Sequence, residues 1–324
     1  MRALLCKEHG PANKLVVETV DDPTPGKGEV LIEVAAAGIN FPDTLIIEGK
    51  YQMQPPMPFT PGGEAAGTVV AVGEGVKRVT VGQRVIALCM IGAFAEKLVA
   101  PEVAVVPMPD EMDFVTAAGF TLTYATSYYA LKQRAQLADG DSLLVLGAAG
   151  GVGLAAVELG RIMGATVIAA ASNDEKLAAT KEAGATHLLN YTQDDVKKTV
   201  KALTDGRGVD VVYDPVGGEL SEQALRATAW DGRFLVIGFA SGDIPKIPLN
   251  LPLLKGLHIV GVFWGSWVTQ FPKESMGNMA ELFGFYTAGQ LKPRVTQTYS
   301  LDQYEEAFGV LTGRRAIGKV VFTL

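Results

Sequence analysis

Leu143-Leu-Val-Leu-Gly-Ala-Ala-Gly-Gly-Val-Gly153 leads from an apolar segment directly into a glycine-rich turn. Ser142 to Leu146 is short and apolar, as is typical of a buried parallel strand, and Leu154 to Met163 has the apolar spacing of a helix. The glycines let the backbone bend sharply, and the unpaired N–H groups of a helix that begins near Gly151 attract phosphate charge. The pattern predicts a site for the pyrophosphate of a dinucleotide.

The context of the turn makes this signal more specific than the glycine spacing alone. Ala148 stands at the first position of the Gly-x-Gly-x-x-Gly pattern, while Gly150 and Gly153 fill the other two. Gly164 ends the helix, and Thr166 to Ala171 is predicted to be a second buried strand. A strand–helix–strand unit is therefore complete within about 30 residues, a context that a tight turn without a ligand does not require.

The end of the second strand distinguishes NADP from NAD. An Asp or Glu about 20 residues after the glycines would bind the ribose 2′-hydroxyl of NAD. This chain has Ser172 and Asn173 there, and the first acid, Asp174, falls in the next helix. Small polar residues leave room for a 2′-phosphate that Lys176 can neutralise, so the sequence favours NADPH. Ser172 could also form a capping box with Glu175, and the two roles are compatible.

Bulk composition limits the classes of protein to consider. A chain of 324 residues with 48% hydrophobic and 19% charged residues is expected to form two globular domains. We expect a cytoplasmic location, because the start of the chain lacks an apolar signal core and no stretch reaches the ~18 apolar residues of a membrane span. The net charge of −7 disfavours a nucleic-acid partner.

Cysteine and histidine usage argues against a metal centre. Cys6 and Cys89 are the only cysteines, which excludes a disulfide framework and a four-thiolate zinc lobe. His9, His187 and His258 have no partner at metal-ligand spacing, so we interpret them as surface or packing residues.

The secondary-structure pattern changes after about residue 120. Before Thr116 the chain is rich in Val, Gly and Pro and predicts a mainly β domain. After it, helices alternate with apolar strands, which predicts a doubly wound parallel sheet. We expect a first domain of residues 1–124, completed by 264–324, and a nucleotide-binding domain of residues 125–263. The expected strands are Val30–Ala35, Gly67–Val72, Arg84–Leu88, Ser142–Leu146, Thr166–Ala170, His187–Leu189, Val209–Tyr213, Phe234–Ile237, His258–Phe263 and Gly318–Thr323, with a helix at Ser275–Thr287.

Several ordered motifs extend along the chain. They are Pro25-Gly26-x-Gly28-Glu29-Val30, Ala36-Ala37-Gly38-Ile39-Asn40-Phe41-x-Asp43, Gly49-x-Tyr51, Pro61-Gly62-Gly63-Glu64-x-x-Gly67, Ala148-Ala149-Gly150-Gly151-Val152-Gly153 and Gly318-Lys319-Val320-Val321. With them the chain resembles the medium-chain dehydrogenase/reductase superfamily over its full length, and most closely the zinc-free quinone oxidoreductase branch that includes zeta-crystallin. The resemblance implies a GroES-like catalytic domain, a Rossmann domain and an active site in the cleft between them.

Two positions separate this chain from the zinc-dependent members. Those enzymes have Cys where this chain has Asn40 and His where it has Gly63. We therefore expect no catalytic zinc. Without a metal, an unactivated alcohol is a poor substrate, whereas a conjugated acceptor already spreads the charge that hydride addition creates. Quinones, enones and enoyl esters meet that requirement.

The resemblance implies that Asn40, Asp43, Tyr51 and Thr126 lie near the nicotinamide and the substrate. The Asn40 amide and the Tyr51 and Thr126 hydroxyls can donate hydrogen bonds to a developing oxyanion. Asp43 is expected to brace the site, and the proton comes from water or from Tyr51. The structural alternatives are a turn role for Asn40 and a packing role for Tyr51.

The cofactor assignments come from the resemblance and from the chemistry of the residues. Lys176, Tyr191 and Arg314 are assigned to the 2′-phosphate together with Ser172, and the sequence does not decide between Arg314 and Arg315. The backbone around the turn should hold the pyrophosphate, and the loops after two late strands should flank the nicotinamide. These segments contain Ala149, Gly150, Gly151, Val152, Gly238, Phe239, Ala240, Val262, Phe263 and Trp264. An apolar wall for a planar acceptor could include Phe41, Tyr51, Phe263, Trp264 and Trp267, or these side chains could simply pack.

The sequence thus predicts an NADPH-dependent reductase of quinones or α,β-unsaturated carbonyls. Two alternatives stay open: an enoyl-thioester reductase, and a dinucleotide-binding protein with a structural or RNA-binding role. The resemblance also implies a homodimer formed through the apolar edge strand near His258 to Phe263.

Overall fold

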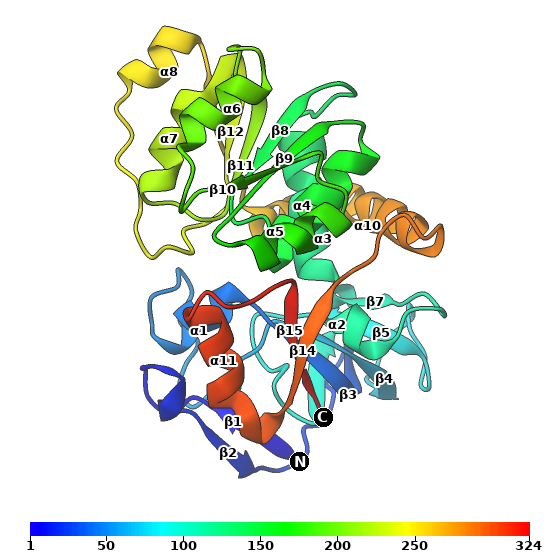
Figure 1. Cartoon of the computed structure of the whole chain (residues 1–324). Helices are drawn as coiled ribbons and strands as arrows, with labels where there is room; N and C mark the ends of the chain where they lie inside the picture. Colours follow the sequence, from blue (N-terminus) through cyan, green and yellow to red (C-terminus); the bar gives the residue numbers. More distant parts are fainter. The chain divides into compact units, whose positions relative to one another are not determined.

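The structure, a computed structural model, describes residues 1–324, and the chain divides into two compact units. The first unit consists of Met1–Leu122 and Pro293–Leu324, and the second of Thr123–Lys292. In Figure 1 the blue to cyan segments and the final segment, which runs from orange at Pro293 to red at Leu324, make up the first unit. Each unit has its own hydrophobic core. No helix combines the length and the apolar character that crossing a bilayer requires.

The first unit is built mainly of antiparallel strands around β3 (Glu29–Ile39). Along β3, Val30, Ile32 and Val34 are buried and alternate with less buried residues, as the pleat of a half-buried strand requires. The sheet has the order β14-β15-β3-β4-β5-β7, and β6 also pairs with β3. Its other strands are β4 (Glu64–Val72), β5 (Arg84–Leu88), β6 (Lys97–Pro101), β7 (Val105–Pro107), β14 (Val295–Ser300) and β15 (Lys319–Thr323).

Shorter elements surround this sheet. β1 (Arg2–Leu5) and β2 (Val16–Thr19) form a separate two-stranded sheet. The helices are α1 (Phe41–Ile47), α2 (Phe114–Ala118) and α11 (Tyr304–Thr312), with 3-10 turns η1 (Ala12–Lys14), η2 (Glu102–Ala104) and η4 (Leu301–Gln303). In the core, the Phe94 ring meets Phe322 and Phe308 edge to face, with ring centroids 5.0 and 6.1 Å apart. The C-terminal segment therefore contributes to the core of the N-terminal domain.

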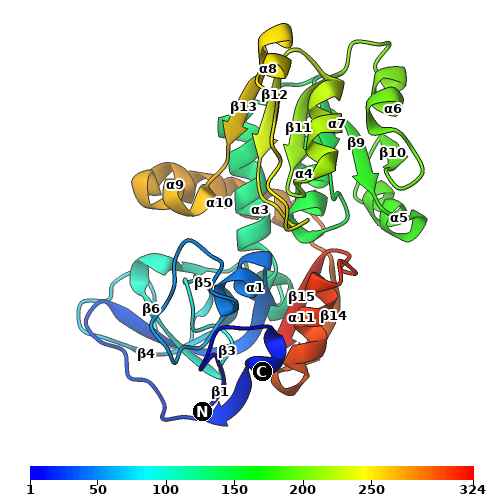
Figure 2. The same ribbon diagram turned by 90° about the vertical axis from the view of Figure 1, so that its left-hand side faces the viewer.

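The second unit contains a six-stranded parallel sheet of order β10-β9-β8-β11-β12-β13. In this doubly wound order the strands are added first to one side of β8 and then to the other, so the strand order reverses beside β8. Ligands bind at the carboxyl ends of the strands near such a point. Figure 2 shows β13 at one edge of this sheet and β10 at the other. The strands are β8 (Ser142–Val145), β9 (Thr166–Ala171), β10 (His187–Asn190), β11 (Val209–Asp214), β12 (Thr228–Val236) and β13 (His258–Gly261).

Helices connect and cover these strands. They are α3 (Thr121–Tyr129), the π-helix η3 (Ala130–Arg134), α4 (Gly151–Ile162), α5 (Asp174–Glu182), α6 (Val196–Leu203), α7 (Glu219–Ala227), α8 (Asn250–Lys255), α9 (Trp264–Gln270) and α10 (Pro272–Thr287). Most strand boundaries lie within a few residues of the expected ones. β12 is longer than expected because it continues through Asp231, with a φ of 57°, and Gly232, where its pairing with β11 is irregular.

The chain returns to the first unit at Pro293, whereas we expected the return near residue 264. Aromatic and polar contacts keep α9 and α10 in the second unit. The Trp267 ring stacks on Tyr129 with centroids 4.4 Å apart, and Lys132 pairs with Glu281 at 2.6 Å. Figure 2 shows α9 and α10 beside α3.

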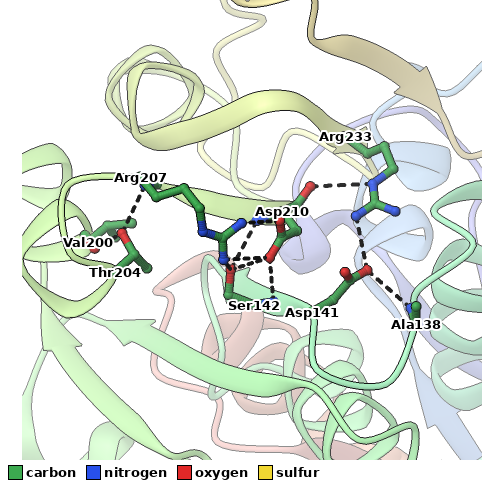
Figure 3. A network of polar contacts seen from close by, with 9 residues as sticks. Ala138, Asp141, Ser142, Val200, Thr204, Arg207, Asp210 and Arg233 are labelled. Carbon is green, nitrogen blue, oxygen red and sulfur yellow. Dashed lines mark hydrogen bonds and ion pairs between the residues drawn. The ribbon is translucent and has the colours of Figure 1, made fainter.

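A polar network fixes the amino ends of the central strands (Figure 3). The Asp210 carboxylate accepts the Ser142 hydroxyl at 2.7 Å and the Arg207 guanidinium at 3.0 Å, and Arg233 donates to Asp141 at 3.0 Å. Partial burial opposes ionisation of Asp210, but the bonds from Arg207 and Ser142 outweigh it and lower its pKa to about 2. The network lies at the amino ends of β8 and β11, opposite the carboxyl ends at which ligands bind in doubly wound sheets.

Candidate active site

A buried polar cluster lies where β3 ends and α1 begins. Asn40 precedes the helix, and its backbone N–H donates to the Asp43 carboxylate at 2.7 Å. This bond is half of a capping box, and Pro42 occupies a first-turn position where its missing N–H is not needed. Asn40 is 6% and Asp43 2% exposed, so the start of α1 is a buried polar site.

The last strand adds a positive charge to this cluster. Val320 of β15 pairs with Ile39 of β3, which brings Lys319 beside Asn40. The Lys319 ammonium donates to Asn40 Oδ1 at 2.6 Å and to the Ile39 carbonyl at 3.1 Å, and it pairs with Glu64 at 3.4 Å. Glu64 is completely buried, and its second oxygen accepts the N–H of Leu122 at 2.8 Å.

The Asn40 side chain is fully engaged by these neighbours. Its Nδ2 lies 3.2 Å from the Gly38 carbonyl and 3.3 Å from Glu64 Oε2, while Oδ1 accepts from Lys319. Donation of an amide hydrogen to a substrate oxygen would therefore require the release of one of these acceptors. The sequence alone did not reveal this, because Glu64 and Lys319 are remote from Asn40 along the chain.

Burial changes the acidity of the groups around Asp43. Desolvation raises the pKa of Asp43 to about 7, against the opposing effects of the Asn40 N–H bond and the Lys319 charge. Tyr51 is half-buried, and its pKa is raised first by burial and then by the charge of Asp43. Of the residues expected in the site, Asn40, Asp43 and Tyr51 thus lie together in the first unit.

The zinc-ligand positions of related dehydrogenases have no suitable donors here. Gly63 has no side chain, and a Cβ at this position would lie 3.1 Å from the carbonyl oxygen of Cys89. Asn40 faces the ammonium of Lys319, which is itself a cation. No three His, Cys, Asp or Glu residues come together with metal-binding geometry. The donor set therefore does not fit a catalytic zinc.

In the second unit, the glycine-rich turn is shaped for a phosphate group. α4 begins at Gly151 after the N-cap Gly150, and no side chain caps this end. A Cβ on Gly150 would meet only the Gly147 carbonyl, at 3.5 Å, so this face is open, whereas a Cβ on Gly153 would lie 2.3 Å from that oxygen. The uncapped first-turn N–H groups, including those of Gly151 and Val152, fit a pyrophosphate.

The groups expected at a 2′-phosphate gather at the ends of β9 and β10. The Lys176 ammonium donates to the Ser172 hydroxyl at 3.2 Å, and the Tyr191 N–H bonds to the Ala171 carbonyl at 3.1 Å. Asn173 caps α5 by accepting the Lys176 N–H at 2.9 Å, so the proposed capping role of Ser172 with Glu175 is wrong.

The other expected cofactor residues are distributed over three places. Ala149 is buried in a small cluster with Ala171 and Leu177, which joins the turn to α5. The loop containing Gly238, Phe239 and Ala240 follows β12, and the Ala240 N–H bonds to the Pro215 carbonyl after β11 at 3.0 Å. Val262, Phe263 and Trp264 follow β13, where the Val262 N–H bonds to the Val236 carbonyl at 3.0 Å.

Helix α3 contains Thr126 and, next to it, Ser127, whose contacts with α4 and β11 were not predicted from the sequence. Thr126 is half-buried. Its neighbour Ser127 donates to the Val152 carbonyl at 2.9 Å and lies 2.8 Å from the hydroxyl of Tyr213. Ser127 thus fixes the first turn of α4, and no motif pointed to it.

Arg314 and Arg315 lie in the first unit, just after α11. The Arg315 guanidinium donates back to the Gly309 carbonyl at 3.2 Å, near the end of the helix. Arg314 has a φ of 54°. The contact of Arg315 does not decide which of the two arginines binds an anion, so both stay candidates.

Comparison with known proteins agrees with both halves of this architecture. Residues 26–110 match the family model of the alcohol dehydrogenase GroES-like domain, and residues 151–282 match the zinc-binding dehydrogenase model. A quinone oxidoreductase-like protein 2 homolog from Nematostella vectensis is 40% identical, with 99% of this chain and 88% of that protein covered. The chain belongs to the medium-chain dehydrogenase/reductase superfamily, in its zinc-free quinone oxidoreductase branch.

Two bacterial members of this superfamily support that placement. The quinone oxidoreductase of Pseudomonas aeruginosa is 35% identical, with 92% of this chain and 91% of that protein covered. The crystal structure of Escherichia coli quinone oxidoreductase in complex with NADPH has a TM-score of 0.95 at 29% identity, and it covers all of both chains. The predicted fold class, a GroES-like domain with a Rossmann domain, is confirmed.

An Asp43→Asn variant tests the buried carboxyl group. The pKa of Asp43 is about 7 in the folded chain, and an unfolded Asp titrates near pH ~4. Between these two pH values Asp43 is protonated in the folded state and ionised in the unfolded state. As the pH rises from about 4 to about 7, the wild type should lose unfolding free energy relative to the variant, on the order of 2 to 4 kcal/mol, and then level off.

Urea unfolding of both proteins across this pH range measures the difference. Asp302→Asn serves as control, because Asp302 forms an exposed ion pair with Arg2 and should give a nearly constant difference from the wild type. Parallel profiles for the wild type and Asp43→Asn would contradict the assignment.

Proposed function

We propose that this chain is an NADPH-dependent, zinc-independent oxidoreductase that reduces quinones or α,β-unsaturated carbonyl compounds. The observation that carries the proposal is the uncapped start of α4 at the glycine-rich turn. The side chains around Asn40, with Lys319 among them, support it because they do not form a set of metal donors. The named relatives, a quinone oxidoreductase-like protein 2 homolog and a quinone oxidoreductase, support the same activity.

The Rossmann unit would hold the cofactor. The backbone from Ala149 to Val152 would bind the pyrophosphate, and the Lys176–Ser172 contact, with Tyr191 next to it, suits a 2′-phosphate. We also assign Arg314 to this phosphate, and the loops at 238–240 and 262–264 to the nicotinamide ring. Bound NADPH supplies a hydride.

Hydrogen-bond donors would stabilise the negative charge that reduction creates on the acceptor. We assign the Tyr51 hydroxyl as a hydrogen-bond donor to the acceptor oxygen, and Asp43 as the group that braces the start of α1. The Thr126 hydroxyl, which belongs to the second unit, is assigned as a further donor. A conjugated acceptor spreads the developing negative charge over several atoms, so hydrogen bonds suffice where an alcohol substrate would need a metal ion.

The decisive assay follows NADPH oxidation in the presence of a chelator. An ortho-quinone, a simple enone and a short enoyl-CoA are compared at matched concentrations. We expect turnover of the quinone or the enone at the same rate with and without chelator. Turnover of the thioester alone would contradict the proposed acceptor class and favour an enoyl-thioester reductase. Tight NADPH binding without any turnover would favour a dinucleotide-binding protein.

A Lys176→Glu variant tests the choice of cofactor. Replacing the ammonium with a carboxylate repels a 2′-phosphate, so the Michaelis constant for NADPH should rise about tenfold or more, while that for NADH changes little. Lys181→Glu is the matched control, since Lys181 lies at the other end of the same helix and should leave both constants unchanged. Equal effects of Lys176→Glu on both cofactors would remove the phosphate assignment.

We also propose a homodimer in the cytoplasm. β13 is an edge strand of the second sheet, and Ile259 on it and Phe263 after it are 43% and 58% exposed, which favours pairing with a second copy. Both cysteines are free, as is usual in a reducing compartment. Sedimentation analysis should give a dimer that Ile259→Asp dissociates. A monomeric wild type at micromolar concentration would contradict the dimer.

A further inference from the structure

We propose that Lys319 is a positioning residue for the reduction. Its ammonium group, held in a buried ion pair with Glu64, sets the orientation of the Asn40 side chain. This inference rests on the proposed function, because it concerns the site at which the acceptor would be reduced. It extends that function by giving a role to Lys319 and Glu64, which have none in the proposed function.

The contacts of the ammonium group carry the inference. Lys319 has three N–H donors, and three acceptors surround it: Asn40 Oδ1 at 2.6 Å, the Ile39 carbonyl at 3.1 Å and Glu64 Oε2 at 3.4 Å. An amide can rotate to exchange its oxygen and nitrogen, but only the oxygen can accept from an ammonium. Lys319 therefore directs Asn40 Oδ1 toward β15, and Nδ2 toward Glu64 and Gly38.

The surrounding backbone is shaped to keep this pair in place. A Cβ on Gly38 would lie 2.0 Å from the Ala118 carbonyl and 3.0 Å from Glu64 Oε2. A Cβ on Gly119 would lie 3.2 Å from the Cβ and Cγ atoms of Lys319. Small residues on both sides thus let the charged side chains pack against the main chain, with 7% of the Lys319 side chain and none of the Glu64 side chain exposed.

Stability alone does not account for a charged pair at this place. A buried ion pair loses the solvation of both charges, and apolar residues of similar volume are often as stable or more so. Here the pair lies among residues of an otherwise apolar core, with Asn40 and Asp43 beside it. A role in directing the polar groups of the site explains why charges, and not two apolar side chains, occupy these positions.

The charge of Lys319 also reaches Asp43. The groups that face Asp43 are the Asn40 and Gly63 N–H groups, Lys319 on β15, Glu64 on β4 and Tyr51. Lys319 favours the ionised form of Asp43, and Glu64 opposes it. Removal of Lys319 should therefore raise the pKa of Asp43, and any step in the rate profile that depends on this carboxyl should move to higher pH.

The experiment compares the full-length wild type with Lys319→Met and with the double variant Lys319→Met/Glu64→Gln. Steady-state rates with NADPH and the quinone are measured from about pH 5.5 to 9, together with thermal midpoints. Lys319→Met should lower kcat about tenfold or more, change KM for NADPH less than about twofold, and move the acid limb of kcat to higher pH. Lys97→Met is the control, because Lys97 forms a surface pair with Asp22 and should leave all three unchanged.

The double variant separates positioning from folding. It removes both charges, so its thermal midpoint should recover toward the wild-type value because no buried charge is left unpaired, while kcat stays low. Recovery of kcat together with the midpoint would overturn the proposal, since the pair would then serve only stability. Wild-type kcat with an unshifted pH profile in Lys319→Met would overturn it as well.

A second measurement is independent of catalysis. In protein labelled with ¹⁵N-asparagine, the side-chain amide signals of Asn40 report its orientation. They should shift or broaden in Lys319→Met and stay unchanged in Lys97→Met. If the wild type turned over no acceptor, the proposed function would fail while this signal still tested the inference. An unchanged Asn40 signal in Lys319→Met would overturn the inference itself.

Discussion

The antiparallel pairing of β15 with β3 is the constraint on which the first unit depends. The chain leaves this unit after Leu122, builds the whole parallel sheet of the second unit, and returns at Pro293 to supply two strands and a helix. Phe308 and Phe322 from this last segment pack on Phe94, so the core is incomplete without it. The same pairing places Lys319 next to Asn40, and the fold and the candidate site thus depend on one strand pairing.

Much of the fold could be predicted because it depends on local patterns. The apolar run before the glycine turn, the helix from Gly151 and the alternation of strands and helices are all visible within short windows of sequence. The boundary near residue 264 was wrong, because nothing in that window reports that Trp267 stacks on Tyr129 or that Glu281 pairs with Lys132. Tertiary contacts decide to which domain such helices belong.

The candidate site was predictable only in part, for a related reason. Asn40, Asp43 and Tyr51 lie within a short segment that the motifs identify. Ser172 and Lys176 are four residues apart around the start of α5, so their proximity follows from local structure. Lys319 and Glu64 are far apart in the chain, and a Lys beside the apolar run Val320-Val321 gives no sign of being buried. Both residues lie in ordered motifs of the chain, but no local pattern indicates a role for either of them.

A buried carboxylate accepts a main-chain hydrogen bond at each of the two points where the chain passes from one unit to the other. Glu64 accepts the N–H of Leu122, the last residue of the first unit before the crossing. Glu158 on α4 accepts the N–H of Lys292, the last residue of the second unit, at 3.0 Å and the hydroxyl of Tyr124 at 2.6 Å. A carboxylate that accepts a main-chain N–H fixes that segment more firmly than an apolar contact, because the bond is directional and charge-assisted. Each carboxylate also belongs to an element to which we assign a function, since Glu64 pairs with Lys319 and Glu158 lies on α4, the helix proposed to bind the pyrophosphate. The two points at which the chain crosses between the units are therefore anchored to the elements that we propose bind the acceptor and the cofactor.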